Sequence, residues 1–233
     1  MKFSTLAQVA RHGRNAFQRA FPNLLPGSIR SVPGVFQPYN HTLPDRYPWL
    51  FGFAAARLGT RPDLKILSFG CSRGAEPDTL RKYFPNAQIK GIDIDPRNIA
   101  HCMTRTWATD SASTTFAVAA GTEGEPAESF DAIFCLAVLC HGDLTTTGAQ
   151  HCDPYLYFER FERIVTDFAR CLKPGGLLLL HTANFRFCDT AVSRVFESVL
   201  NADPAQLAPD VVFDRNNRLM KGERYLAVAF RKR

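Results

Sequence analysis

The sequence lacks three features that would each fix a class of protein. No apolar stretch approaches the roughly 20 residues that span a bilayer, because the longest run covers only residues 133–140. No C-x-x-C pair and no helical H-x-x-x-H pair is present, so we expect no metal site. The seven cysteines are odd in number and scattered, which excludes a regular disulfide framework and indicates a reduced, cytoplasmic protein.

Acidic residues are absent from positions 1–44, which hold five basic residues. The net charge of +6 therefore comes almost entirely from this arm. Apolar residues at helical spacing across positions 3–21 predict a basic amphipathic helix, and six prolines across positions 22–48 predict an ordered strap or a flap. This composition agrees with several interpretations. The arm could be a helix packed on the main domain, a contact with an anionic substrate, a membrane surface or a nucleic acid, or a mitochondrial presequence.

A glycine loop between two apolar runs is the most informative motif. Residues 66–69 predict a buried parallel strand, the turn of residues 70–74 leads into a helix over residues 78–83, and residues 87–92 predict a second strand. Asp93 ends that strand, 23 residues after the first glycine, where a carboxylate can accept both hydroxyls of a ribose. This order is half of a doubly wound nucleotide fold, with its ligand crevice at the carboxyl edge of the sheet.

The spacing of the glycines argues against a dinucleotide. The loop reads G-x-x-x-G, whereas a pyrophosphate site has G-x-G-x-x-G at a helix start. Cys71 and Ser72 occupy the positions of the phosphate-binding glycines, and Glu76 near the helix start would repel a pyrophosphate. A carboxylate there suits a cationic ligand, so a nicotinamide-dependent oxidoreductase is the less favoured interpretation.

With these residues, the segment resembles motifs I and II of the class I S-adenosylmethionine-dependent methyltransferases. Residues 130–139 and 172–180 resemble the fourth strand of that family and the turn and strand that follow it. The resemblance implies an α/β fold with a doubly wound, mostly parallel, seven-stranded Rossmann-like sheet, an antiparallel C-terminal strand pair and helices on both faces. We expect residues 1–60 to form the basic arm and strap, and residues 61–233 to form the methyltransferase domain.

The resemblance also implies S-adenosylmethionine as the cofactor and assigns contacts to it. Gly70, Cys71, Ser72 and Gly74 would line the methionine part of the cofactor, and Glu76 would bind its ammonium group. Asp93 would hold the ribose. Ile94 and Thr122 would flank the adenine, and Cys135 and Leu136 would lie beneath the cofactor.

The substrate side is predicted from residues that follow the fourth and fifth strands. His141 is the candidate general base, because an imidazole near neutral pH can take a proton from a hydroxyl or amine; the alternative is a hydrogen bond to a loop carbonyl. Asp143 would orient His141 or cap the next turn. His181 and Asn184 face the same crevice as candidate substrate contacts, and capping of the next helix is the alternative for Asn184.

Other segments complete the predicted fold. We expect a helix over residues 49–58, a helix with a buried apolar stripe over residues 158–172, and a helix over residues 189–200. Residues 211–213 and 225–230 would then form the closing antiparallel strands.

The sequence therefore predicts a methyltransferase acting on an oxygen or nitrogen of a small metabolite or saccharide. The glycine loop and fourth strand look most like those of chemotaxis-receptor glutamate methyltransferases, but Leu136-Ala137 and Cys140-His141 replace the Arg-Asn and Tyr-Phe of those enzymes. A protein carboxyl methyltransferase and a non-catalytic cofactor-binding protein are the alternatives. The expected partner is a small molecule, and the basic arm would suit an anionic one. Neither a nucleic-acid partner nor a transmembrane segment is expected.

Overall fold

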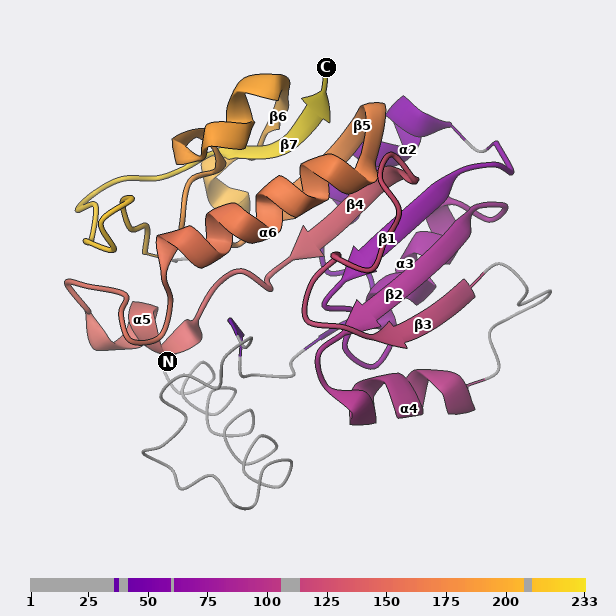
Figure 1. Ribbon diagram of the computed structural model, residues 1–233, viewed down its shortest axis with the longest axis horizontal. Helices are drawn as coiled ribbons and strands as arrows, with labels where there is room; N and C mark the ends of the chain where they lie inside the picture. Colours follow the sequence, from indigo (N-terminus) through magenta and orange to yellow (C-terminus); the bar gives the residue numbers. More distant parts are fainter. Residues whose placement is uncertain (1–35, 38–41, 60, 106–113, 208–210) are drawn as a thin grey trace.

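A seven-stranded sheet forms the centre of the protein, which we describe from a computed structural model covering residues 36–37, 42–59, 61–105, 114–207 and 211–233. The strand order is β3-β2-β1-β4-β5-β7-β6 (Figure 1). The first five strands in this order pair in parallel, and β7 runs antiparallel to both of its neighbours. The strands are β1 (Lys65–Phe69), β2 (Gln88–Asp93), β3 (Thr114–Val118), β4 (Phe130–Leu136), β5 (Leu172–His181), β6 (Phe196–Asn201) and β7 (Ala227–Lys232).

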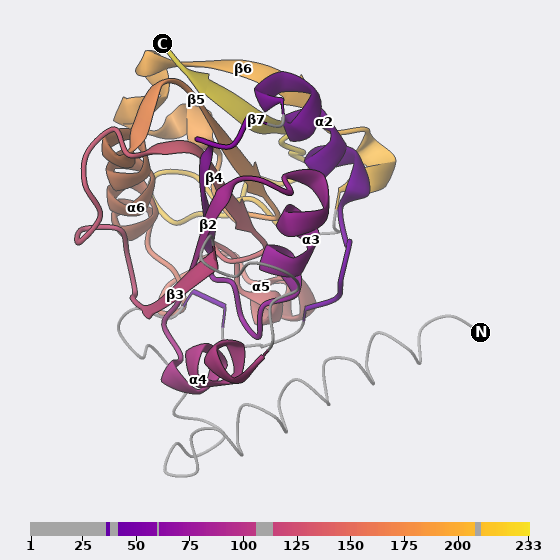
Figure 2. The same ribbon diagram turned by 90° about the vertical axis from the view of Figure 1, so that its right-hand side faces the viewer.

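Helices cover both faces of this sheet. Figure 2 shows α6 on one side of the strands and α2 and α3 on the other. The helices are α2 (Pro48–Leu58), α3 (Ala75–Tyr83), α4 (Pro96–Thr104), α5 (Gly142–Thr147) and α6 (Phe158–Cys171), with short 3₁₀ turns η2 (Phe187–Asp189), η3 (Ala191–Val195) and η4 (Pro204–Gln206). The predicted α/β fold with a closing antiparallel pair is confirmed.

The sheet separates two hydrophobic cores, as the alternation along β4 shows. Ile133 and Cys135 pack in the core under α6, whereas Phe134 and Leu136 pack in the core under α2 and α3. Every residue of β4 is buried, because both faces of a central parallel strand are covered. The apolar stripe predicted on α6 is also confirmed, since Phe161, Val165 and Phe168 lie in the first core.

Two predictions about the C-terminal third are wrong. Residues 191–195 form η3 and residues 196–201 form strand β6 in place of the helix predicted over residues 189–200, because β6 pairs with β7. Residues 211–213 form only isolated bridges, from Phe213 to Phe185 and Leu219, so β6 takes their place in the antiparallel pair. The helix predicted over residues 78–83 is present but begins earlier, at Ala75.

The predicted amphipathic helix of residues 3–21 lies outside the described residues, as does most of the proline-rich strap. Of the segment predicted as arm and strap, α2 is described, and its Leu50, Phe51 and Ala54 are buried in the second core. None of the helices in the part of the chain that the structure describes is long and apolar enough to cross a membrane.

Candidate active site

The backbone amides of the loop between β1 and α3 donate hydrogen bonds to other groups of the protein. The amides of Gly70 and Cys71 both donate to the carbonyl of Ile92, at 2.8 and 2.9 Å. The amide of Ser72 donates to Oδ2 of Asp93 at 2.8 Å. A phosphate cradle needs several amides that point at the ligand, and these three successive amides point at β2 instead. The loop geometry therefore agrees with a ligand that carries no phosphate.

Two positions in the loop require glycine for different reasons. Gly70 has a φ of 74°, and a Cβ there would lie 2.5 Å from Cγ2 of Val138. The close approach at Gly70 is therefore made by a side chain from the loop that follows β4. Gly74 has a φ of 90° and immediately precedes α3. Both backbones lie in the left-handed region, which L-residues with a β-carbon rarely adopt.

Asp93 ties the end of β2 to the loop. Its Oδ2 accepts from the amide of Ser72, and its Oδ1 accepts from the amide of Asp95 at 2.8 Å and from Nδ2 of Asn98 at 3.0 Å. Burial raises the pKa of Asp93, and these hydrogen bonds oppose that rise. A carboxylate has about four acceptor positions, so Asp93 retains capacity for about one further donor. The sequence predicted two ribose hydroxyls at this carboxylate.

Glu76 places a second carboxyl group beside the loop. Oγ of Ser68, on β1, donates to Oε1 of Glu76 at 2.7 Å. Although Glu76 keeps some solvent exposure as a residue, burial of its carboxyl group raises its pKa to about 8, against the lowering effects of the Ser68 hydrogen bond and the charge of Arg46. A carboxyl group held this way gains from an ammonium partner, so the site fits the amino group of S-adenosylmethionine.

Arg46 was missed by the sequence analysis. It lies on the segment that precedes α2, its Nη2 is 3.5 Å from the carbonyl of Leu136, and its charge acts on both Glu76 and His181. The neighbouring Asp45 fixes this segment by donating its amide to Oγ1 of Thr79, on α3, at 3.0 Å. A guanidinium and a carboxyl group at one edge match the two charges of the amino-acid end of the cofactor. Only the path of the chain brings Arg46 there, and no local motif marks it.

Exposed apolar side chains lie at the ends of β2 and β3. Ile94 is 37% exposed and Val118 is 53% exposed, and Asp93 pairs with Val118 across the two strands. Exposed apolar side chains beside the Asp93 carboxylate provide a surface for a flat apolar ring. Val118 was also missed, because it reads as an ordinary strand residue. Thr122 is buried, and its hydroxyl donates to Oδ2 of Asp167 on α6.

His141 and Asn184 form a buried connection between the loops after β4 and β5. The amide of His141 donates to Oδ1 of Asn184 at 2.7 Å, and Nδ2 of Asn184 donates to the carbonyl of Val211 at 2.7 Å. Nδ1 of His141 accepts from the amide of Asp143 at 3.3 Å, so the neutral ring carries its proton on Nε2. Burial lowers the pKa of His141, with Asp143 opposing. In this arrangement Nε2 is a hydrogen-bond donor.

His181 differs from His141 because its ring has no hydrogen-bond partner among the described residues at either nitrogen. It ends β5, pairs with Leu136 across β4 and β5, and lies edge-on to the rings of Tyr47 and Trp49 at 4.6 and 5.6 Å. Burial, with a smaller effect of the Arg46 charge, lowers its pKa to about 4. His181 is therefore neutral at physiological pH and retains an acceptor nitrogen.

Most of the predicted site residues lie in two groups. The loop, Asp93 and Ile94 lie at one end of the carboxyl edge, while Glu76, Leu136 and His181 lie together with Arg46 on the α2 and α3 face. Cys135 packs in the core under α6, and burial and the charge of Glu76 both raise the pKa of its thiol, so it also lies near that group. In the described ranges, no three His, Cys, Asp or Glu side chains gather closely enough to hold a metal ion.

Comparison with known proteins covers the same part of the chain. Residues 67–180 match the sequence model of the family described as a methyltransferase domain. No curated protein sequence matches the chain. Solved structures that resemble it include phosphoethanolamine N-methyltransferase 2 of Haemonchus contortus, geranyl diphosphate C-methyltransferase of Streptomyces coelicolor and a putative sarcosine dimethylglycine methyltransferase of Galdieria sulphuraria.

These structural similarities are distant. Identities are 20%, 16% and 20%, the matches cover 60%, 57% and 56% of this chain, and TM-scores are 0.44, 0.42 and 0.44, in that order. The matches cover 29% to 43% of the three solved chains. The evidence for the family lies in the matched domain, the sheet order and the glycine loop. The chain carries a class I S-adenosylmethionine-dependent methyltransferase domain, and S-adenosylmethionine is its cofactor.

Proposed function

We propose that this protein transfers a methyl group to an oxygen or nitrogen atom of a small metabolite or saccharide. The observation that carries the proposal is the neutral, unpartnered imidazole of His181 at the carboxyl edge of the sheet. A neutral imidazole can accept a hydrogen bond from an O–H or N–H group and then receive its proton. Acceptor atoms of these two kinds lose a proton when they are methylated.

The remaining residues would hold the cofactor, which supplies the methyl group as a reactive sulfonium. Glu76 would bind the ammonium group and Arg46 the carboxylate of its amino-acid end, with Ser68 orienting Glu76. Asp93 would accept one ribose hydroxyl. Ile94 and Val118 would contact the adenine, and the loop of residues 70–74 would approach the methionine chain. Positioning of this kind supplies most of the rate enhancement in a transfer between two bound partners.

His181 would act on the acceptor. A hydroxyl that has begun to bond to carbon is strongly acidic, so a weak base with a pKa near 4 is sufficient to take its proton. An amine acceptor would become an ammonium group, which would lose its proton to water after the transfer. His141 would instead position the substrate side, because its Nδ1 is engaged with the amide of Asp143 and its own amide is held by Asn184. The base role that we predicted for His141 from the sequence is therefore proposed for the other buried histidine.

A turnover assay with matched histidine variants tests this proposal. The protein is incubated with S-adenosylmethionine and a panel of alcohols, phenols, amines and sugars, and S-adenosylhomocysteine and methylated products are measured by mass spectrometry. We expect O- or N-methylated product, and a loss of turnover of about 10²- to 10⁴-fold in His181→Leu at unchanged S-adenosylhomocysteine affinity. His151→Leu is the control, because His151 is 56% exposed at its side chain.

Three results would contradict the proposal. Methylation of carbon would contradict an oxygen or nitrogen acceptor, and unchanged turnover in His181→Leu would exclude His181 as the base. Base-labile methyl esters on an added protein would favour the protein carboxyl methyltransferase alternative.

A further inference from the structure

Two cysteine thiols meet beside the cofactor loop. Cys71 follows Gly70 in the loop and is 1% exposed, and Cys102 lies on α4 and is fully buried. Sγ of Cys102 donates to the carbonyl of Ser72 at 3.4 Å, and Sγ of Cys71 lies 3.7 Å from the same oxygen. The two cysteine side chains also form a hydrogen bond with each other. The loop and α4 therefore carry two thiols in direct contact.

The same loop and helix hold the carboxylate assigned to the ribose. The amide of Ser72 donates to one oxygen of Asp93, and Nδ2 of Asn98 donates to the other. Asn98 and Cys102 lie about one turn apart on the buried face of α4. A change in the distance between Cys71 and Cys102 therefore acts on both of these hydrogen bonds.

The two thiols differ in acidity. The hydrogen bond to Cys102, burial and the charge of Asp93 raise the pKa of the Cys71 thiol. The hydrogen bond from Cys71 lowers the pKa of Cys102, the charge of Arg105 lowers it further, and burial and nearby carboxylates oppose them. Nη1 of Arg105 is fixed by donating to the carbonyl of Arg73 at 3.0 Å. Because the thiolate is the reactive form of cysteine, Cys102 is the one of the pair that reacts first.

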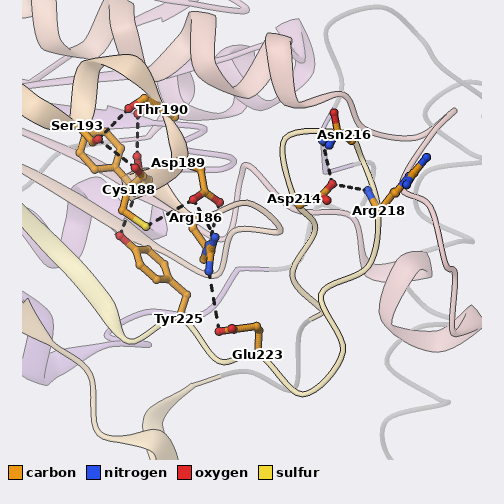
Figure 3. A network of polar contacts seen from close by, with 11 residues as sticks. Arg186, Cys188, Asp189, Thr190, Ser193, Asp214, Asn216, Arg218, Glu223 and Tyr225 are labelled. Atoms are coloured by element: carbon orange, nitrogen blue, oxygen red, sulfur yellow. Dashed lines mark hydrogen bonds and ion pairs between the residues drawn. The ribbon is translucent and has the colours of Figure 1, made fainter.

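The exposed cysteine of the chain has different surroundings, as Figure 3 shows. Sγ of Cys188 lies 3.8 Å from Oδ1 of Asp189, and the amide of Cys188 donates to the hydroxyl of Tyr225 at 3.3 Å. Burial and the charge of Asp189 raise the pKa of its thiol. Its contacts in the figure are with a carboxylate and a phenol, so Cys188 is the matched control for the buried pair.

We propose that Cys71 and Cys102 form a reversible disulfide, with a peroxide as the oxidant, and that this disulfide weakens binding of the cofactor. The sulfur of Cys102 attacks one oxygen of hydrogen peroxide, the O–O bond breaks, and the departing hydroxide takes the thiol proton, which leaves a sulfenic acid and water. The sulfur of Cys71 then attacks the sulfur of Cys102, the S–O bond breaks, and a second water leaves with the proton of Cys71. Two thiols are oxidised and one peroxide is reduced.

Formation of the disulfide alters the cofactor loop. A disulfide holds its sulfur atoms about 2.05 Å apart, which is much closer than two thiols in contact. Sγ of Cys71 packs beside Gly91 on β2, where a Cβ would lie 3.0 Å from it. The new bond draws Cys71 toward α4 and so displaces Ser72 and Asn98 relative to Asp93. A displaced Asp93 loses its charged hydrogen bond to the ribose, which lowers affinity by at least about tenfold.

Burial of both thiols makes their oxidation depend on the cofactor. Peroxide reaches them only when the loop separates locally from α4. A cofactor bound on the loop opposes this opening. Coupling between two sites is reciprocal, so a disulfide that weakens binding of the cofactor is itself disfavoured by the bound cofactor. S-Adenosylhomocysteine should therefore slow formation of the disulfide.

Treatment of the full chain with hydrogen peroxide tests the proposal. Peptides are mapped by mass spectrometry without reduction, and the affinity for S-adenosylhomocysteine is measured by calorimetry before treatment, after treatment, and after addition of dithiothreitol. We expect a peptide pair joined through Cys71 and Cys102, at least about tenfold weaker binding, and recovery of the affinity with dithiothreitol. Excess S-adenosylhomocysteine during the treatment should reduce the yield of the joined peptides.

Matched cysteine variants assign the effect, each compared with its own untreated sample. Cys102→Ser retains a hydroxyl donor for the carbonyl of Ser72 and cannot form the disulfide, so peroxide should leave its affinity unchanged. Cys71→Ser is a second variant of the same kind. Cys188→Ser should respond to peroxide as the wild type does.

Three results would overturn the inference. They are a treated wild type in which these two cysteines are not joined, a joined protein that binds S-adenosylhomocysteine as tightly as the reduced one, and a loss of affinity that persists in Cys102→Ser and Cys71→Ser. The inference depends on the cofactor site and not on the methyl acceptor, so a failure of the proposed O- or N-methylation would leave it intact.

Discussion

Replacing Glu76 with glutamine removes the charge of its carboxyl group while retaining its size. In the cofactor-free protein the pKa of Glu76 is about 8, so the group is mostly protonated at pH 7. The ammonium group of the cofactor favours the ionised carboxylate. Binding at pH 7 should therefore release a proton from Glu76, and the Glu76→Gln variant should release none.

The size of this effect follows from the pKa. A group with a pKa of about 8 is about nine-tenths protonated at pH 7, so about 0.9 proton should leave per S-adenosylhomocysteine bound. Affinity should rise between about pH 6 and pH 8, approaching tenfold per pH unit. At pH 8, loss of the charged hydrogen bond, worth about 1.5–3 kcal/mol, should weaken binding by about 10- to 150-fold in Glu76→Gln.

Titration calorimetry in phosphate and in Tris measures the released proton, because the two buffers differ in ionisation enthalpy. 5′-Methylthioadenosine is the matched ligand, since it retains the adenosine and lacks the amino-acid end; its affinity should be the same in the wild type and in Glu76→Gln. A binding enthalpy that does not depend on the buffer, or an equal loss of affinity for both ligands, would refute the assignment of Glu76 to the ammonium group.

The same substitution should stabilise the cofactor-free protein. The folded-state pKa of Glu76 lies above its ordinary value of 4.5, so the folded protein binds more protons than the unfolded chain between about pH 4.5 and pH 8. Its free energy of unfolding therefore falls as the pH rises through that window. The free energy of unfolding of Glu76→Gln should not fall in this window. At pH 8 the variant should therefore unfold at a higher temperature than the wild type, as thermal denaturation would show.

Three further substitutions test the cofactor site, with affinities measured by calorimetry. Arg46→Met should weaken S-adenosylhomocysteine by about 10- to 150-fold and leave 5′-methylthioadenosine unchanged, because only the former carries a carboxylate; an equal effect on both would exclude that contact. Asp93→Ala should weaken both ligands, since both carry the ribose, and unchanged affinities would place the ribose elsewhere. Gly74→Val should abolish binding of both, and the cost of a β-branched residue at a φ of 90°, about 1–2 kcal/mol, is small enough for the domain to remain folded. Normal binding by this folded variant would show that the loop does not contact the ligand.

The cofactor side was predictable because its signals are local. The strand before Gly70, the turn to Gly74 and the carboxylate of Asp93 follow one another along a short stretch, and each residue type has a direct physical reason for its position. The structure adds that Asp93 already accepts three hydrogen bonds, one of them from the loop. Those partners depend on the folded path of the loop and could not be counted from the sequence.

The substrate side and the amino-acid end of the cofactor site were less predictable, because both are assembled from distant segments. Arg46 reaches the edge of the sheet from the segment before α2, and no spacing rule connects it with Glu76. The choice between His141 and His181 depends on which ring nitrogens are engaged, and an amide two residues away decides it for His141. The helix predicted over residues 189–200 failed for a related reason: pairing of β6 with β7 overrides the local pattern.

The central claim is that the edge beside the Gly70 loop binds S-adenosylmethionine rather than a dinucleotide. Titration calorimetry of the full chain with S-adenosylhomocysteine, and separately with NAD, tests it most directly. We expect one equivalent of S-adenosylhomocysteine per chain and no binding of NAD, because the amides of Gly70, Cys71 and Ser72 are already paired and Glu76 opposes a pyrophosphate. Binding of NAD in competition with S-adenosylhomocysteine, or no binding of S-adenosylhomocysteine at all, would contradict it.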